Sequence, residues 1–147
     1  MLPEAAALRR GAEGYFLTTE DVMDKSQFHD YIDSFNRNDF EGFSKYYADD
    51  VLLELPNKQL HGRQAIVDFY RLVKARVRET LQINQLVCDA DGLAAEVATE
   101  FHGLEDWPEF IAGPLRKGES IRIISFVMYR MRNGKFAHIR SARFRRL

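Results

Sequence analysis

The hydrophobic pattern of this chain changes its period near Arg78, and that change constrains the fold more than any other feature of the sequence. Before this point, apolar side chains recur every three or four residues, as on the buried face of an amphipathic helix. After it, they alternate with polar side chains, beginning with Leu81 and Ile83, as in half-buried strands. We therefore expect helices followed by a sheet, an order typical of an α+β domain.

Three helices are predicted before the change of period. The first spans residues 24–36 and carries an apolar stripe at positions i, i+3, i+4 and i+7: Phe28, Tyr31, Ile32 and Phe35. The second is N-capped by Asp39, ends at Asp49-Asp50, and carries an aromatic stripe: Phe40, Phe43, Tyr46 and Tyr47. The third follows Gly62 and carries an apolar stripe: Ile66, Phe69, Tyr70, Val73 and Val77.

Strands are predicted between and after these helices. A short strand at 51–55 stops at Pro56, and a brief one lies near 59–61. Long strands are expected at 93–103, 119–132 and 135–145, with hairpin turns at Asp91-Gly92 and Asn133-Gly134. The alternation that begins at Leu81 shifts its phase at residues 86–88, which indicates a bulge. Residues 104–117 form a loop longer than an ordinary hairpin connection.

Size and composition indicate a single domain. A chain of 147 residues that is 46% hydrophobic has room for one sizeable core. We assign residues 23–147 to this domain and residues 1–22 to an N-terminal extension. The lone Cys88 cannot form an internal disulfide, which fits a reducing, cytoplasmic setting.

The same composition argues against several classes of partner. A formal net charge of −1 is not that of a dedicated nucleic-acid-binding protein. No stretch approaches the roughly 18 apolar residues of a membrane span. The four histidines lack the spacing of a metal site, and no phosphate-binding motif of an organic cofactor is present, so we expect neither metal nor cofactor.

Three segments resemble the nuclear-transport-factor-2-like superfamily, which includes ketosteroid isomerases and SnoaL-like polyketide cyclases. They are NRNDFEGFSKYYADDVLLELP, HGRQAIVDFY and NGKFAHIRSARF, and the resemblance extends over about residues 24–145. It implies a cone-shaped α+β barrel, in which three N-terminal helices pack in the concave face of a curved, mostly antiparallel sheet. Such a fold commonly keeps a pocket at its wide end.

The resemblance to ketosteroid isomerases can be carried over position by position between residues 30 and 56. Tyr31 falls at the tyrosine that hydrogen-bonds the oxyanion, and Tyr47 and Tyr70 fall at two tyrosines that support it. The general base is an aspartate before a proline in the isomerases, and here that position is Leu55. The second acid falls at or near Ser125. The hydrogen-bond donors are therefore kept, whereas the usual base is missing.

A replacement base must come from elsewhere. SnoaL-like cyclases use an aspartate late in the sheet, but no Asp or Glu follows Glu119 in this chain. We consider His102, which could pair with Glu100 in the segment TEFHG, and Asp106 in the long loop. The alternative for Glu100 and His102 is an outward polar pair at a dimer face.

Strand parity predicts which side chains surround a ligand. If Val97, Thr99 and Phe101 face inward, alternate positions of the next two strands do so as well: Ile123, Ser125, Val127 and Tyr129, then Ala137, Ile139, Ser141 and Arg143. Arg143 could then bind a carboxylate or enolate. Trp107 in the loop would cover the mouth. The predicted ligand contacts are Phe35, Tyr47, Leu55, Phe69, Tyr70, Val97, Thr99, Phe101, Trp107, Ser125, Val127, Ser141 and Arg143.

These features predict a small cofactor-free enzyme that isomerises, cyclises or dehydrates a hydrophobic carbonyl compound. Tyr31 would donate to the oxyanion, and His102 or Asp106 would move the proton. The alternative is a non-catalytic module that binds a small ligand or another protein through the same fold. In both cases we expect a homodimer through the outward sheet face, where Ile124, Phe126 and Met128 are apolar.

Overall fold

The computed structural model describes residues 23–147, so the predicted extension at 1–22 lies outside the described residues. The described chain forms three helices, α2 (Lys25–Asn36), α3 (Phe40–Ser44) and α4 (Arg63–Arg76). Its strands are β1 (Tyr47–Leu55), β2 (Lys58–His61), β3 (Val77–Asp89), β4 (Gly92–Gly103), β5 (Ser120–Arg132) and β6 (Lys135–Arg146). The α+β class predicted from the change of period is confirmed.

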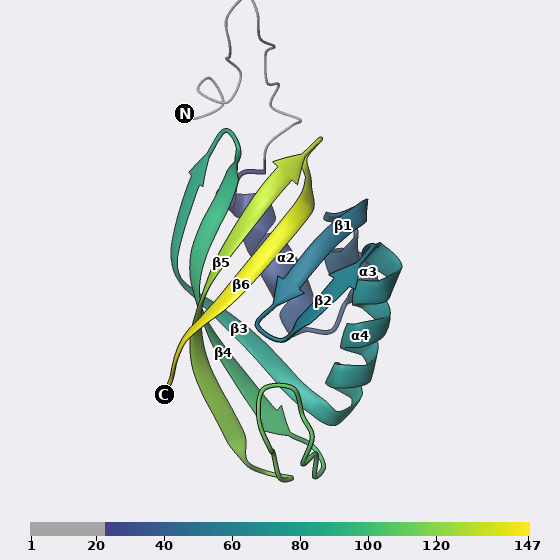
Figure 1. Cartoon of the computed structure of the whole chain (residues 1–147). Helices are drawn as coiled ribbons and strands as arrows, with labels where there is room; N and C mark the ends of the chain where they lie inside the picture. Colours follow the sequence, from purple (N-terminus) through teal and green to yellow (C-terminus); the bar gives the residue numbers. More distant parts are fainter. Residues whose placement is uncertain (1–22) are drawn as a thin grey trace, which may run out of the picture.

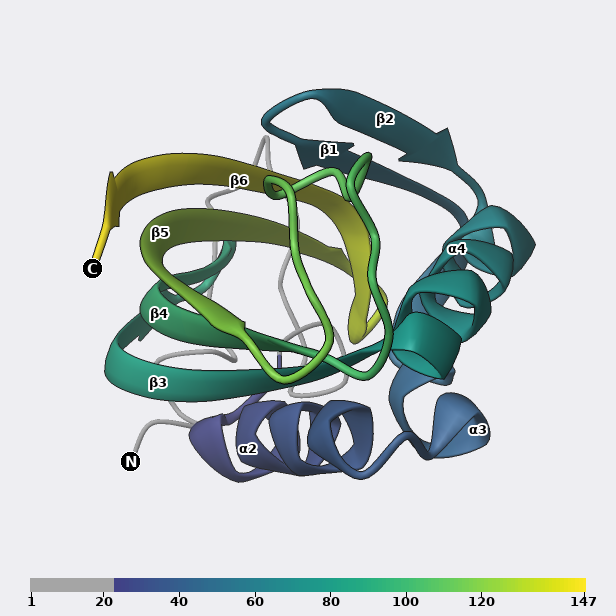
Figure 2. The same cartoon turned by 90° about the horizontal axis from the view of Figure 1, so that it is seen from below.

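The strands form one sheet in the order β2-β1-β6-β5-β4-β3. Neighbouring strands are antiparallel except β1 and β6, which run parallel. The sheet curves strongly, and α2 and α4 lie along its inner side (Figure 1). From below, the segment between β4 and β5 crosses the open end of the curve (Figure 2). Within residues 23–147, no helix is long and apolar enough to cross a membrane.

Local sequence signals explain how the elements begin and turn. Asp24 caps α2 through a capping box with Gln27, in which each side chain accepts from the other's backbone N–H. The turn between β5 and β6 holds Asn133 and Gly134 at φ 54° and 76°, the left-handed pair that an Asn-Gly hairpin favours. A bulge is present in β3, but it lies between Ile83 and Gln85, ahead of the predicted residues 86–88, which pair regularly with β4.

The second helix is shorter than predicted. It ends at Ser44, and Tyr47 already belongs to β1, as do Asp49 and Asp50. The backbone N–H of Phe136 donates to the Tyr46 carbonyl at 2.7 Å, so pairing with β6 replaces the next helical turn. The expected aromatic stripe of this helix was therefore wrong beyond Phe43.

Two further predictions are corrected near strand ends. Val77 does not continue α4, because its φ and ψ of −138° and 135° are extended and it begins β3. In β6, Phe136 rather than Ala137 is fully buried, because the pairing with β5 shifts its register between Arg130 and Met131.

Candidate functional site

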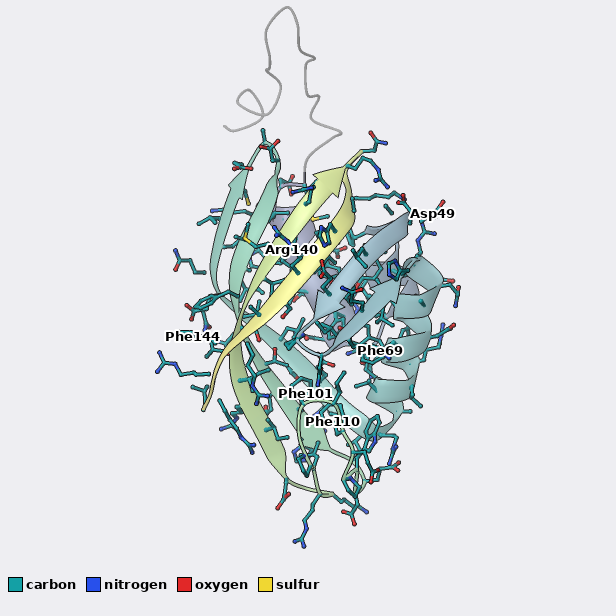
Figure 3. The ribbon with its side chains drawn as sticks, viewed as in Figure 1. Asp49, Phe69, Phe101, Phe110, Arg140 and Phe144 are labelled. Atoms are coloured by element: carbon teal, nitrogen blue, oxygen red, sulfur yellow. The ribbon has the colours of Figure 1, made fainter. Side chains whose placement is uncertain are left out.

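The sheet and the helices enclose a cavity of about 170 Å³. Its walls come from the inner face of β3, β4, β5 and β6, from α2 and α4, from the end of β1, and from the loop that follows β4. Phe69 on α4 and Phe101 on β4 contribute to its apolar wall, and Phe110 contributes from the loop (Figure 3). Most of the lining is apolar, as in small-molecule sites generally.

A pair of tyrosines lies on the cavity wall. The hydroxyl groups of Tyr31 and Tyr47 are 3.0 Å apart, and both residues are buried. Burial, reinforced by charge interaction with neighbouring groups, raises the pKa of Tyr31 well above its ordinary value. The phenol therefore keeps its proton and can donate a hydrogen bond at any physiological pH. This is the requirement for a group that stabilises an oxyanion.

The tyrosine pair is held rigidly by an aromatic cluster. The Phe136 ring lies 4.8 Å from the Tyr31 ring and 5.0 Å from the Tyr129 ring. The Phe28 ring packs edge-on against Tyr129 at 5.1 Å. Edge-to-face packing of this kind favours one ring orientation. The packing of the rings thus fixes where the hydroxyl oxygens lie in the cavity wall.

Tyr70 does not complete the predicted hydrogen-bond chain. Its ring stands nearly perpendicular to Phe35 and at 75° to Phe69, with centroids 4.9 and 5.0 Å away. No hydrogen bond among the described residues joins its hydroxyl to Tyr31 or Tyr47. Burial raises the pKa of Tyr70 well above its ordinary value, so this hydroxyl is also a protonated group in the cavity wall.

The cavity contains one buried carboxyl group, that of Glu79 on β3. The residue is 8% exposed and lines the cavity beside Phe101, its partner on the adjacent strand β4. Within residues 23–147, its carboxylate takes part in no hydrogen bond or ion pair. Burial raises the pKa of Glu79 to about 7, although the positive charge of Lys74 opposes this rise. A carboxylate that titrates near neutrality is suited to general acid–base catalysis.

Lys74 is the buried cation associated with Glu79. It lies in the last turn of α4, 6% exposed, and its ammonium donates to the Phe35 carbonyl at 2.7 Å. The same ammonium stands 3.7 Å from the centre of the Phe35 ring. Burial lowers the pKa of Lys74. The lysine thus sets the electrostatic environment of Glu79 while its own donor is directed to α2.

The mouth of the cavity lies between the β1–β2 turn, the loop after β4 and the end of β6. Pro56, Asn57 and Arg143 are exposed residues of the lining. The Asn57 side chain donates to the Ile111 carbonyl at 3.3 Å, which joins the turn to the loop. Figure 2 shows the loop crossing this end of the molecule. Access to Glu79 and Tyr31 is therefore from this side.

Of the residues predicted to act on a ligand, most lie around this one cavity. Tyr31 and all thirteen predicted contacts except Trp107 line it. Trp107 instead packs against Phe110 and lies under the Arg76 guanidinium, 3.9 Å from the ring centre. The inward parity predicted for β4, β5 and the second half of β6 agrees with this lining. Their role as ligand contacts stays a prediction.

The two predicted proton shuttles lie outside the cavity lining. His102 faces outward on β4, with Nδ1 2.9 Å from the Ser120 hydroxyl. Asp106 is exposed in the loop and accepts from the Lys117 backbone N–H at 2.9 Å. Neither residue lines the cavity in which a ligand would bind, so neither is placed to exchange a proton with that ligand.

Sequence reasoning missed Glu79, although a signal for it was present. Glu79 has the same strand parity as Leu81 and Ile83, which were expected to be apolar positions of the sheet. A carboxylate in phase with inward-facing side chains is a candidate buried acid. At Leu55, the position of the isomerase base, the side chain does line the cavity but carries no ionisable group.

The arrangement can therefore bind an apolar molecule, donate hydrogen bonds to its oxygen from a tyrosine, and exchange a proton with its carbon through Glu79. Within residues 23–147, no three His, Cys, Asp or Glu side chains come together as a metal site would require.

Comparisons with solved structures agree with this architecture. A "putative SnoaL-like polyketide cyclase" from Shewanella denitrificans superposes with a TM-score of 0.69 at 15% identity, over 82% of this chain and 89% of that one. An epoxide hydrolase of the LEH-like type from M. tuberculosis gives 0.66 at 11% identity, over 81% and 80%. A protein of ketosteroid isomerase-like fold from Catenulispora acidiphila gives 0.65 at 10% identity, over 82% and 86%. Identities this low establish a common fold alone.

Sequence comparison assigns the family more specifically. No curated protein matches the chain. The family model of the SnoaL-like domain, however, matches residues 28–139, from the first turn of α2 to the middle of β6. This match spans well over half of the chain and includes the cavity walls contributed by Tyr31, Glu79 and Phe101. The protein therefore belongs to the SnoaL-like family of the NTF2-like superfamily.

Proposed function

We propose that this protein is an enzyme that moves a proton on a small, hydrophobic carbonyl compound bound in the wide end of a cone-shaped barrel. The reaction is of the isomerase, cyclase or dehydratase type, and it begins by abstraction of a proton next to the carbonyl group. The observation that carries the proposal is a buried carboxyl group, Glu79, which has no partner among residues 23–147 and lies in the same apolar cavity as the Tyr31–Tyr47 pair.

In the first step, the Glu79 carboxylate takes a proton from the carbon next to the carbonyl. The electrons of the broken C–H bond form a C=C bond, and the carbonyl π electrons move to oxygen, which becomes an enolate. Tyr31 donates a hydrogen bond to this oxygen, and Tyr47 supports Tyr31 through the 3.0 Å contact. Protonated Glu79 then returns the proton, which regenerates the carboxylate. Return to the γ-carbon of a conjugated dienolate completes an isomerisation, whereas return to the same carbon gives hydrogen exchange only.

The electrostatics of the two groups support these roles. Glu79, with its pKa raised to about 7, is partly deprotonated at neutral pH and still basic enough to accept a proton. Tyr31, with its pKa raised by burial, remains a donor. A preorganised donor in a dry cavity is worth about 10²–10³ in rate. The same fold carries different reactions, which is why the proposal is limited to this common first step.

The test is exchange of α-hydrogens for deuterium in a small cyclic ketone, with cyclohexanone as the first probe. In D₂O, the wild-type protein is expected to accelerate exchange above the buffer rate, as followed by NMR. The Glu79→Gln variant should catalyse exchange on the order of 10²–10⁴-fold more slowly than the wild type, because it removes the base while keeping the side-chain size. Tyr31→Phe should be about 10²–10³-fold slower, because it removes the hydrogen-bond donor.

The matched control is Glu96→Gln, which changes an outward glutamate of β4 that accepts from Asn84. This variant should exchange at the wild-type rate. If a panel of one-ring ketones binds but none exchanges faster than in buffer, the enzyme proposal is wrong. The chain would then be the non-catalytic ligand-binding module of the same fold.

A further inference from the structure

The arginine at the cavity mouth has a role that proton transfer does not require. Arg143 lies on β6 opposite Ser125, is exposed, and lines the cavity. Among residues 23–147, no carboxylate lies within ion-pair distance of its guanidinium. By contrast, Arg122 and Arg132 on β5 pair with Glu100 and Asp50, respectively. Arg143 is thus a cation directed toward the cavity and not committed to a protein partner.

Its neighbours on the strand show that this placement is specific. Arg145, two residues on, does not line the cavity, and its guanidinium lies 4.7 Å from the centre of the exposed Phe144 ring. Figure 3 shows Phe144 at the outer edge of the sheet. Among the described lining residues, Arg143 is the only Lys or Arg, and Glu79 is the only acid. The cavity therefore holds one charged group of each sign.

The size of the cavity limits what can occupy it. A volume of about 170 Å³ is close to that of an engineered apolar cavity of about 150 Å³ that accommodates benzene. One ring, or a short chain of similar size, fills the enclosed part. A four-ring compound would have to extend out through the mouth. A one-ring ligand that reaches from the tyrosines to the mouth would place one polar substituent at Tyr31 and another beside Arg143.

Resting on the proposed function, we propose that the substrate is a one-ring or short-chain carbonyl compound that also carries a carboxylate, which Arg143 binds at the mouth. The planar guanidinium matches a carboxylate through two parallel hydrogen bonds. A carboxylate suits the site better than a phosphate, because a single lining cation balances one negative charge. Binding in this direction leaves the carbonyl group pointing inward, toward Tyr31.

The inner face of β6 connects the two ends of this binding mode. Ile139, Ser141 and Arg143 alternate into the cavity, and Ile139 pairs with Tyr129 in the aromatic cluster. Arg143 lies four residue steps after Ile139, about 13 Å along β6. The space between these two positions, lined by Ser141 and apolar residues, is what the ring would occupy.

The test compares binding of two probes of nearly equal size, 4-oxocyclohexanecarboxylate and its methyl ester, by calorimetry or ligand-observed NMR. The wild-type protein should bind the carboxylate on the order of 10- to 100-fold more tightly, the range of a charge-assisted hydrogen bond at a partly exposed site. Arg143→Gln should bring this ratio close to 1 and leave ester binding unchanged. Arg143→Lys, which keeps the charge but loses the planar fork, should give an intermediate ratio.

The control is Arg145→Gln, which removes an equal charge from the same strand but outside the cavity. It should keep the wild-type preference. Equal binding of the two probes by the wild-type protein would overturn the proposal. So would an equal loss of the preference for the carboxylate in Arg143→Gln and Arg145→Gln. The ratio is measured without turnover, so a failure of the proposed chemistry, seen as exchange that does not depend on Glu79, is distinguishable from a failure of this inference.

Discussion

Glu79 combines two properties that rarely coexist: it is buried in an apolar wall, and it has no hydrogen-bond partner among the described residues. Burial of a charged carboxylate is unfavourable, so its proton affinity rises. Lys74 limits this rise, since its positive charge favours the ionised form. The result is an acid whose two forms are both accessible near neutral pH, as proton transfer in both directions requires.

This balance has a consequence for stability that can be measured. The folded pKa of Glu79 is raised to about 7 from an ordinary value of 4.5. Below pH 4.5 both folded and unfolded chains hold the proton, and the stabilising effect is complete. As the pH rises toward 7, the unfolded chain releases its proton first, so this contribution is lost.

We therefore expect the free energy of unfolding of the wild-type protein to fall between pH 5 and pH 7.5 by about 1–3 kcal/mol more than that of Glu79→Gln. Urea denaturation at the two pH values measures both. The comparison uses the difference between proteins, so titration of groups that do not interact with Glu79 cancels. Parallel pH dependences in the two proteins would mean that Glu79 is not buried as described.

Tyr31 was predicted from the sequence and Glu79 was not, for a physical reason. The helical period places Tyr31 among apolar neighbours, so its inward direction follows from local spacing. Glu79 has the parity of Leu81 and Ile83, but the sequence predicted that Val77 would still be helical, so residue 79 fell at the junction between helix and strand. Strand parity predicts the direction of a side chain only where the residue belongs to the strand.

At the level of strands and helices, long periodic segments were predictable and short ones were not. The Asn133-Gly134 turn joins β5 and β6 as expected, whereas the turn between β3 and β4 lies one residue earlier than predicted, at Ala90-Asp91. The segment at 45–50 was assigned to a helix because its tyrosines continue the spacing of Phe40 and Phe43. In the structure, pairing of Tyr47 with Phe136 decides the outcome, and that partner is 89 residues away in sequence, a distance no local pattern reports.

The loop over the mouth depends on Gly103 at the end of β4. A Cβ at this position would lie 2.5 Å from the Arg116 carbonyl oxygen, which is backbone and cannot simply rotate away. The Gly103 backbone also exchanges hydrogen bonds with the loop, donating to Glu119 and accepting from Gly118, both at 2.8 Å. Two ends of the loop are thus held together by a close approach that only glycine permits.

We expect Gly103→Ala to displace the base of the loop and to destabilise the protein by about 1–3 kcal/mol. Hydrogen exchange should show that, relative to the wild type, amide exchange is accelerated more in residues 104–119 than in the rest of the protein. Binding of a ketone probe should weaken. Asp24→Ala is the contrasting variant. It removes the cap of α2 and should cost about 1 kcal/mol without a selective effect on the loop. Uniform exchange in Gly103→Ala would contradict the role given to this contact.

Considered as a whole, the molecule has an apolar outer face that the cavity does not use. Phe126 and Phe144 are 44% and 54% exposed and their ring centroids are 4.9 Å apart, and Met128 nearby is 49% exposed. Three large apolar side chains gathered on one face of a sheet are unfavourable in water. This arrangement supports the predicted homodimer, in which each copy would cover the same face of the other.

Light scattering at micromolar concentration should therefore give the mass of a dimer. Phe126→Asp should produce monomers, because it places a charge in the centre of the apolar patch. Leu72→Asp changes a single, 59% exposed leucine on α4 and should leave the dimer intact. A monomeric wild-type protein would refute the prediction.

The cavity also explains how the family fold can retain a catalytic layout without the isomerase base. Leu55 and Glu79 line the same space from β1 and β3, so a carboxylate can approach a ligand from either wall. Under the proposed function, Tyr31 and Tyr47 keep the donor positions of the isomerases, and the base is supplied by β3 instead of β1. Under this account, the ligand is oriented by Tyr31 at one end and by Arg143 at the other.

The most direct measurement is the pH dependence of ketone α-hydrogen exchange in the wild-type protein and in Glu79→Gln, recorded side by side. The account predicts a protein-dependent rate that increases through a midpoint near neutrality in the wild type, as Glu79 loses its proton, and that disappears in the variant. A variant that exchanges as fast as the wild type, with the same dependence on pH, would show that the buried carboxyl group of Glu79 is not the base.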